Sequence, residues 1–223
     1  MTTHLRRLIA TSLILCAVLS VVWTLLLPEH LEDPRDHLIA IADAGLTGDI
    51  ALMLLALSQL AFMVGFAGVT AWLHPSSPRL ATIGGTLAVL GGFGHAVHSG
   101  AEMARQTLAS DPDGHAAIAG RLLDSPALMP FMMIGLVGTV AGLVLLGIAH
   151  LRSRAAPRWT GPVVVAFVLV EFIGSNVSPW ATYLAGLLLL VACGGLASGL
   201  IRPSRSLTGD ETVSTPRTKV KIR

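Results

Sequence analysis

Long apolar runs alternate with short polar segments along almost the whole chain. Five runs are about 20 residues or longer, enough to cross a hydrocarbon core of about 30 Å at 1.5 Å per residue; they cover residues 8–27, 50–73, 80–101, 127–149 and 180–201. A sixth run, 161–177, is shorter and is interrupted by Glu171, Ser175 and Asn176. Counting it as a span predicts an all-α, polytopic membrane bundle of six transmembrane helices within residues 1–202.

The composition supports a surface that is covered by lipid. Of 223 residues, 53% are hydrophobic and only 13% are charged, and the mean hydropathy is +0.72. A soluble domain carries roughly 25% charged residues, so this chain has too few for a surface facing water. The first run is longer than the apolar part of a signal peptide and has no small-x-small cleavage site, so we expect it to be retained as a helix.

The basic residues predict the orientation. One set of termini and loops carries Arg6, Arg7, Arg79, Arg152, Arg154, Arg158, Arg202, Arg205, Arg217, Lys219, Lys221 and Arg223, whereas the opposite side carries only Arg35, Arg105 and Arg121. Because basic residues are retained in the cytoplasm, both termini are predicted to be cytoplasmic, in the inner (plasma) membrane of a bacterium. The net positive charge thus reflects a gradient from one side of a membrane to the other. It gives no support to nucleic-acid binding, and nucleic acid is not predicted as a partner.

Two segments on the external side share a pattern. Asp33-Pro34 and Asp111-Pro112 each predict the start of a helix, with a capping carboxylate and a proline in the first turn. Each pair is followed by apolar residues at helical spacing. We expect short amphipathic helices at 34–45 and 112–124, lying on the outer surface. The spacing of 78 residues fits either a duplicated hairpin or convergent capping. Residues 203–223 are predicted to be a disordered basic tail in the cytoplasm.

Ionisable and amide side chains interrupt the apolar runs in the predicted outer leaflet. His95, His98 and Glu102 fall within about 60° of one another on a helical wheel and form one polar stripe. Such groups are costly in lipid, usually face the bundle interior, and mark functional sites. His95 and Glu171 are predicted to lie roughly 10–13 Å below the external interface. The predicted binding residues are therefore His95, His98, Glu102, Glu171, Gln59 and Asn176.

This polar layer leaves several functions open. The first is a site that binds or transports a small molecule or an ion; the second is acid–base catalysis on a lipid or isoprenoid substrate; the third is a structural or accessory subunit. His95, His98 and Glu102 can reach one metal ion from one helix face, yet H-x2-H-x3-E is no established zinc signature. No cofactor is therefore predicted. Each residue also has a structural interpretation, since Glu102 can snorkel and His98 can bond a neighbouring helix.

Small residues predict where helices approach closely. Gly138-x3-Gly142, Gly195-x3-Gly199 and five glycines between 84 and 94 permit close contact between backbones. Cys16 and Cys193 lie inside predicted helices, where two cysteines make no disulfide framework; we expect them to be inert apolar residues.

Several segments together resemble the six-helix inner-membrane proteins of unknown function found in high-GC bacterial genomes. They are the external Asp-Pro helix, the Trp72-Leu73-His74-Pro75 end of the second run, the Arg-Ala-Ala-Pro-Arg-Trp segment 154–159, and thirteen arginines against two lysines. The resemblance implies a membrane helical bundle that is located in the inner membrane. It implies no activity and assigns no site residue, and the histidine-rich third run is not typical of that group.

Overall fold

The computed structural model describes residues 1–26, 31, 33–155 and 157–202, and this part of the chain is helical and contains no strand. The all-α prediction is therefore confirmed. The elements are α1 (Thr3–Leu26), α2 (Pro34–Leu73), α3 (Pro78–Leu108), α4 (Pro112–Leu123), α5 (Met129–Ser153), α6 (Thr160–Phe172), the 3-10 turn η1 (Gly174–Asn176) and α7 (Pro179–Ile201). The predicted tail, 203–223, lies outside the described residues.

Five helices in the described part of the chain are long and apolar enough to cross a membrane: α1, α2, α3, α5 and α7. The predicted sixth run, 161–177, forms the shorter helix α6 and then η1. The 13 residues of α6 correspond to about 20 Å of helix. Pro179 follows closely and favours extended backbone at Ser178, which separates η1 from α7.

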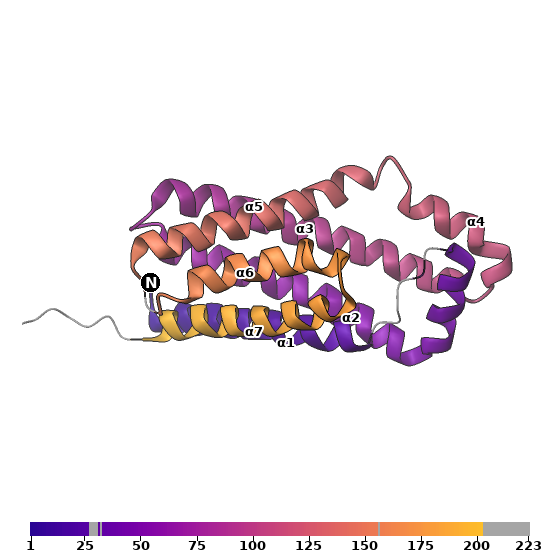
Figure 1. The fold of residues 1–223 in the computed structure, drawn as a ribbon, viewed down its shortest axis with the longest axis horizontal. Coiled ribbons are helices and arrows are strands. Elements are labelled where there is room, and N and C mark those ends of the chain that lie inside the picture. The colour runs from indigo at the N-terminus through magenta and orange to yellow at the C-terminus, as the bar shows by residue number, and fades with distance from the viewer. Residues whose placement is uncertain (27–30, 32, 156, 203–223) are drawn as a thin grey trace, which may run out of the picture.

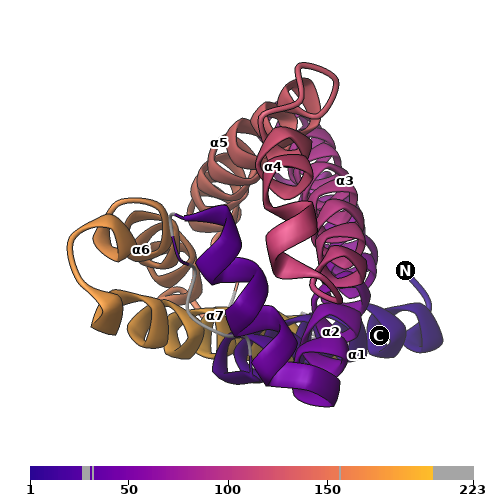
Figure 2. The same cartoon turned by 90° about the vertical axis from the view of Figure 1, so that its right-hand side faces the viewer.

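The long helices pack in chain order around a ring. Each of α1, α2, α3, α5 and α6 packs against the next of these helices, and α7 packs against both α6 and α1. Figure 2 shows this arrangement from one end, with α4 and the first part of α2 nearest the viewer. These six helices run alternately in opposite directions, so the start of α1 and the end of α7 lie at the same end of the bundle (Figure 1).

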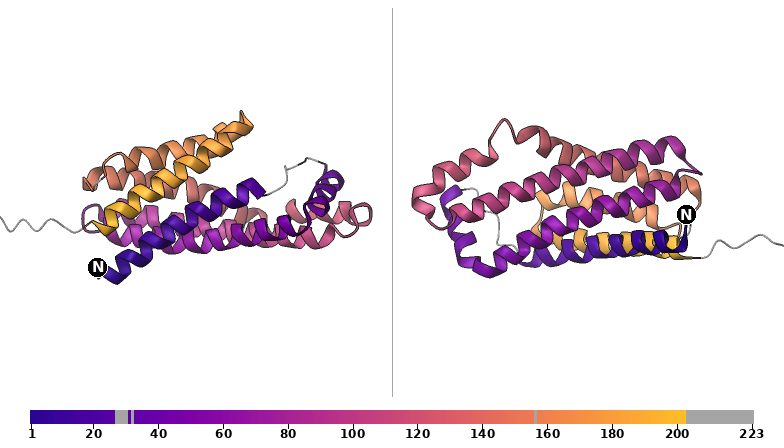
Figure 3. Two further views of the ribbon diagram at one scale, coloured as in Figure 1. Left: turned by 90° about the horizontal axis from the view of Figure 1, so that it is seen from below. Right: turned by 180° about the vertical axis from the view of Figure 1, so that it is seen from behind.

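α2 changes direction at Gly45, where the predicted outer helix 34–45 ends. Gly45 has φ 50° and ψ −130°, which lies outside the helical region and which glycine adopts readily because it has no Cβ. The segment 34–45 turns sharply away from the rest of α2 and lies beside α4 (Figure 3). The two predicted surface helices thus share one end of the bundle, which we call the α4 end.

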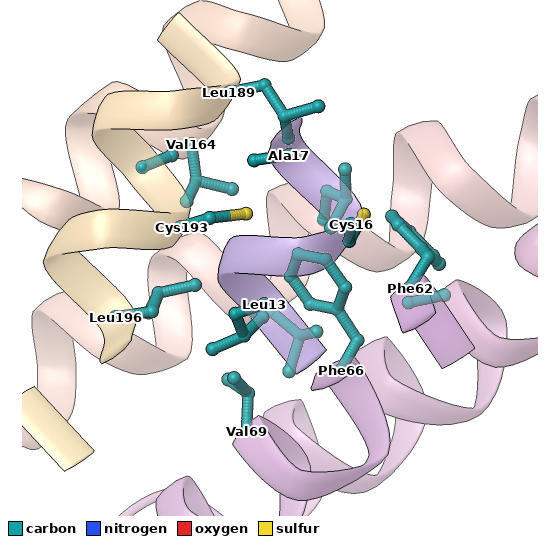
Figure 4. Packing of buried hydrophobic residues seen from close by; sticks show 14 of the residues in the cluster. Leu13, Cys16, Ala17, Phe62, Phe66, Val69, Val164, Leu189, Cys193 and Leu196 are labelled. Atoms are coloured by element: carbon teal, nitrogen blue, oxygen red, sulfur yellow. The ribbon is translucent and has the colours of Figure 1, made fainter. Parts of the chain in front are cut away.

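Apolar side chains fill the half of the ring that is nearer the termini. Leu13 and Ala17 of α1 are fully buried between α2 and α7, against Phe66 and Leu196 (Figure 4). Cys16 and Cys193 are both buried and free, as expected for inert residues. This packed half supports the opposite half, in which the candidate site lies.

The closest helix pair is α3 with α5. A Cβ built on Gly142 would lie 2.4 Å from the Ala88 backbone nitrogen, and one built on Gly94 would lie 2.4 Å from the Phe131 carbonyl oxygen. Only glycine permits such contact between backbones. The predicted close approach is therefore present at this seam, and it fixes the side of α3 that is turned away from α5.

The outward faces of the long helices are apolar. Large hydrophobic side chains are exposed along α2, α5 and α7, as at Leu57, Leu60, Val64, Met133, Val137, Leu184, Leu187 and Val191. A soluble protein rarely exposes apolar patches of this extent. These faces indicate a protein that is embedded in a membrane.

Candidate functional site

A cavity of about 380 Å³ occupies the α4-end half of the ring. Ligand pockets commonly measure about 300–1,000 Å³, so this volume suits a small molecule. The five long helices and α6 all contribute to its wall. The deepest contributions include Cys16, Phe62 and Thr139, and the packed apolar half begins below this level.

Five of the six residues predicted to bind a ligand line this cavity: Gln59, His95, His98, Glu102 and Glu171. They come from α2, α3 and α6, which are far apart in the sequence. The structure places Asn176 elsewhere. Its side chain is exposed in η1 and donates to the carbonyl of Phe172 at 2.9 Å. It therefore pairs a backbone carbonyl at the C-terminal end of α6.

The polar stripe of α3 contains a buried charge pair. Arg105, which is only 3% exposed, donates from Nη1 to both carboxylate oxygens of Glu102, at 3.1 and 3.3 Å. His98 Nε2 lies 3.8 Å from Glu102 Oε1. Arg105 thus compensates the charge of Glu102 within α3. These contacts between successive turns let α3 continue to Leu108, beyond the predicted end at 101.

Several polar groups of the cavity wall have no partner in the part of the chain that the structure describes. Among the described residues, neither the Glu171 carboxyl nor the His95 imidazole takes part in a hydrogen bond or ion pair of its side chain. In addition, His98 Nδ1 and Thr139 Oγ1 are buried and unpaired. Buried polar groups are normally satisfied. Unpaired groups that line one cavity therefore indicate a place where a ligand or water supplies the missing partners.

The rest of the wall is largely apolar and partly aromatic. Trp23 of α1, Phe62 of α2, and Phe167 and Phe172 of α6 all line the cavity, together with aliphatic side chains. Phe62 also packs against Phe66, with ring centroids 4.5 Å apart. A few polar groups in an apolar wall are typical of small-molecule sites, where the polar groups fix the orientation of the ligand.

Segment 34–45 closes the α4 end of the cavity, and α4 packs against α2 and α3 at the same end. His37 and Ile41 of segment 34–45 line the cavity, and Gln106 donates to Asp49 at 2.6 Å near the same end. Arg35 Nε donates to Asp113 Oδ1 at 2.5 Å, which joins the two short helices. This contact raises the pKa of the Arg35 guanidinium, through the hydrogen bond to Asp113 first and its charge second.

The predicted caps of these short helices are present. Asp33 accepts hydrogen bonds from the backbone nitrogens of Arg35 and Asp36, and Asp111 accepts one from Gly114. Arg35 and Asp113 occupy equivalent positions after the two Asp-Pro pairs, 78 residues apart. Equivalent positions of the two segments therefore meet in space.

Several contributors to the site are not among the residues that the sequence predicts, and Thr139 is one of them. Arg105 counts only among the external charges in the sequence, although its spacing of three residues from Glu102 signals a pair on one helix face. His37 belongs to the segment 34–45, which is predicted to lie on the outer surface, but it is 5% exposed and lines the cavity. Trp23 lay unremarked in the apolar run 8–27, which gives no periodic signal for the face that meets the cavity.

The described residues contain no group of three or more histidine, cysteine, aspartate or glutamate side chains arranged to hold a metal ion. His95, His98 and Glu102 line one cavity, but their shared stripe does not converge on one point. A metal site at these residues stays a hypothesis from the sequence.

Comparisons with known proteins give no match. No protein-family model matches the chain, and neither the curated proteins nor the solved structures contain a significant relative.

Proposed function

We propose that this chain is an integral protein of the bacterial inner membrane that binds a small molecule in the cavity at its α4 end. It spans the bilayer six times, with both termini in the cytoplasm and the cavity in the outer leaflet. The observation that carries the proposal is the gathering of Gln59, His95, His98, Glu102 and Glu171 around one cavity. Polar groups of this kind are costly in lipid, and the cavity gives them a role other than packing.

The proposed orientation rests on charge and on aromatic side chains. Arg35 is in the first turn of α2, Arg105 is in the last turn of α3 and Arg121 is in α4, all at the α4 end, whereas the other described arginines lie at the helix ends nearer the termini. Trp180 and Tyr183 are exposed near the α4 end, and Trp159 is exposed near the other. Tryptophan and tyrosine favour the two membrane interfaces. A reporter enzyme fused after Asp113 is expected to be active outside the cytoplasm, and cytoplasmic activity would overturn the orientation.

Binding is tested with three probes that share a benzyl group and a tetrahedral head: benzyltrimethylammonium, neopentylbenzene and benzylsulfonate. A ligand that binds only the native state stabilises it, by about 2.7 kcal/mol at 100 times its Kd. At least one probe is therefore expected to raise the unfolding temperature of the purified protein in detergent.

A matched pair of variants on α7 shows whether the probe enters the cavity. Gly186 lines it, and a Cβ built there meets only Val21 Cγ2, at 3.1 Å, so Gly186→Leu places side-chain atoms in the cavity. A Cβ built on Gly194 has no neighbour within 4 Å, so Gly194→Leu leaves the cavity open. The proposal requires a response in the wild type and in Gly194→Leu, and none in Gly186→Leu. An equal response in both variants, or no response to any probe, would contradict it.

A further inference from the structure

We infer that the ligand of this cavity is an organic monocation, such as an ammonium group that carries apolar substituents. The inference rests on the proposed function and names the class of its ligand. It combines three features of the wall: the charges, the aromatic side chains and the arrangement of the potential ligating groups.

The charges of the wall favour a cation. Glu102 and Glu171 both line the cavity, and the lining residues of the described chain include no lysine or arginine. Arg105 lies outside the lining and compensates Glu102. Glu171 has no cationic partner among the described side chains. The protein therefore leaves one carboxyl to be matched by a positive charge from the ligand.

Glu171 shares the cavity wall with four aromatic side chains. Phe167 precedes it by four residues, on the same face of α6, and Phe172 follows it directly; both line the cavity. Trp23 and Phe62 add rings from α1 and α2. Aromatic faces attract cations by about 0.5–2 kcal/mol each, and they recognise quaternary ammonium groups in particular. Carboxylate and rings together suit a cation with an apolar surface.

A bare metal ion suits the wall less well. A divalent ion takes several charged or neutral oxygen and nitrogen ligands that converge on one point. The described residues form no such group. An organic cation needs only one carboxylate nearby, since its remaining contacts are with apolar and aromatic side chains. The wall provides these from α1, α2, α6 and α7.

The test compares benzyltrimethylammonium with neopentylbenzene, its neutral isostere, by calorimetric titration of the purified full-length protein. The cation is expected to bind the wild type at least tenfold more tightly than the isostere. Glu171→Gln keeps the shape and removes the charge, so it should abolish this preference, whereas Glu171→Asp should retain it. Asp43→Asn makes the same change of charge at an exposed position outside the cavity, and it should bind both probes as the wild type does.

The outcomes separate the two proposals. Equal binding of cation and isostere to the wild type, with both excluded by Gly186→Leu, would overturn the cation and leave the binding cavity standing. Undiminished binding of the cation to Glu171→Gln would also overturn the cation and leave the binding cavity standing. If neither probe nor benzylsulfonate binds, the proposed function itself is wrong. Should Glu171→Gln fail to fold, the comparison of the two probes on the wild type still decides the class of ligand.

Discussion

Gly142→Ala is expected to destabilise the bundle, although alanine is the better helix former. In an unhindered helix interior, replacing glycine by alanine stabilises by roughly 0.5–1 kcal/mol. At Gly142 the new Cβ would lie 2.4 Å from the Ala88 nitrogen and 2.8 Å from the Gly84 carbonyl oxygen. Both atoms belong to the backbone of α3, so no side chain can move aside and the two helices must separate.

The cost of that separation follows from packing. Ordinary contacts begin at 3.4 Å, so α3 and α5 must move apart locally by about 1 Å. A gap of that size forfeits a quarter to a half of each contact's attraction of about 0.1–0.2 kcal/mol. Because many atom pairs along the seam lose attraction together, the loss is on the order of 1–2 kcal/mol. Lipid tails are as apolar as the helix faces, so no hydrophobic term offsets it.

The assay is equilibrium unfolding of the purified protein in mixed micelles of mild detergent and dodecyl sulfate, followed by circular dichroism. Gly142→Ala should lower the free energy of unfolding by about 1 kcal/mol, because the packing loss of about 1–2 kcal/mol exceeds the gain in helix propensity of roughly 0.5–1 kcal/mol. Gly194→Ala is the matched control, because a Cβ there meets nothing within 4 Å, and it should be neutral or stabilising. If Gly142→Ala is as stable as Gly194→Ala, the close contact along the α3–α5 seam does not exist.

Two further perturbations address charge burial and the bend in α2. Arg105→Gln leaves Glu102 in the wall without its cation, and we expect the free energy of unfolding to fall by about 3–5 kcal/mol in the same assay. Adding Glu102→Gln should recover most of this loss. If the effects of the two substitutions are additive, the pairing of Arg105 with Glu102 is refuted. Gly45→Ala forces a side chain into a backbone conformation that is essentially restricted to glycine, at φ 50° and ψ −130°, at a cost of about 1–3 kcal/mol. Gly100→Ala, whose Cβ also meets open space but in regular helix, should cost nothing, and equal stability of these two variants would show that the bend at Gly45 is absent.

The sequence predicted the helices well because the membrane leaves few alternatives. Backbone polar groups in lipid must be satisfied within the segment, so a long apolar run forms a helix. The bend at Gly45 also coincides with the predicted end of the outer helix. The short α6 was less predictable, because the run 161–177 continues in apolar residues past the point where the helix gives way to η1.

The candidate site could be predicted in part. His95, His98 and Glu102 share a face by helical periodicity, which needs no knowledge of the fold. Glu171 and Gln59 line the same cavity because of the order in which the helices pack. Contacts between residues distant in the sequence determine that order. Asn176 lies close to Glu171 in sequence, but the 3-10 turn that begins at Gly174 carries it out of the helical register, and helical periodicity does not predict that turn.

The shortness of α6 has a consequence for the surrounding lipid. If α6 spans the bilayer as proposed, about 20 Å of helix faces a hydrocarbon layer that is about 30 Å thick, whereas α5, with 25 residues, exceeds that thickness. The protein would then present unequal hydrophobic lengths around its circumference, and the bilayer would have to thin on one side only. Such mismatch costs fractions of a kcal/mol per Å. The proposed sixth span therefore predicts compressed acyl chains beside α6, a strain that bilayers of shorter-chain lipids would relieve.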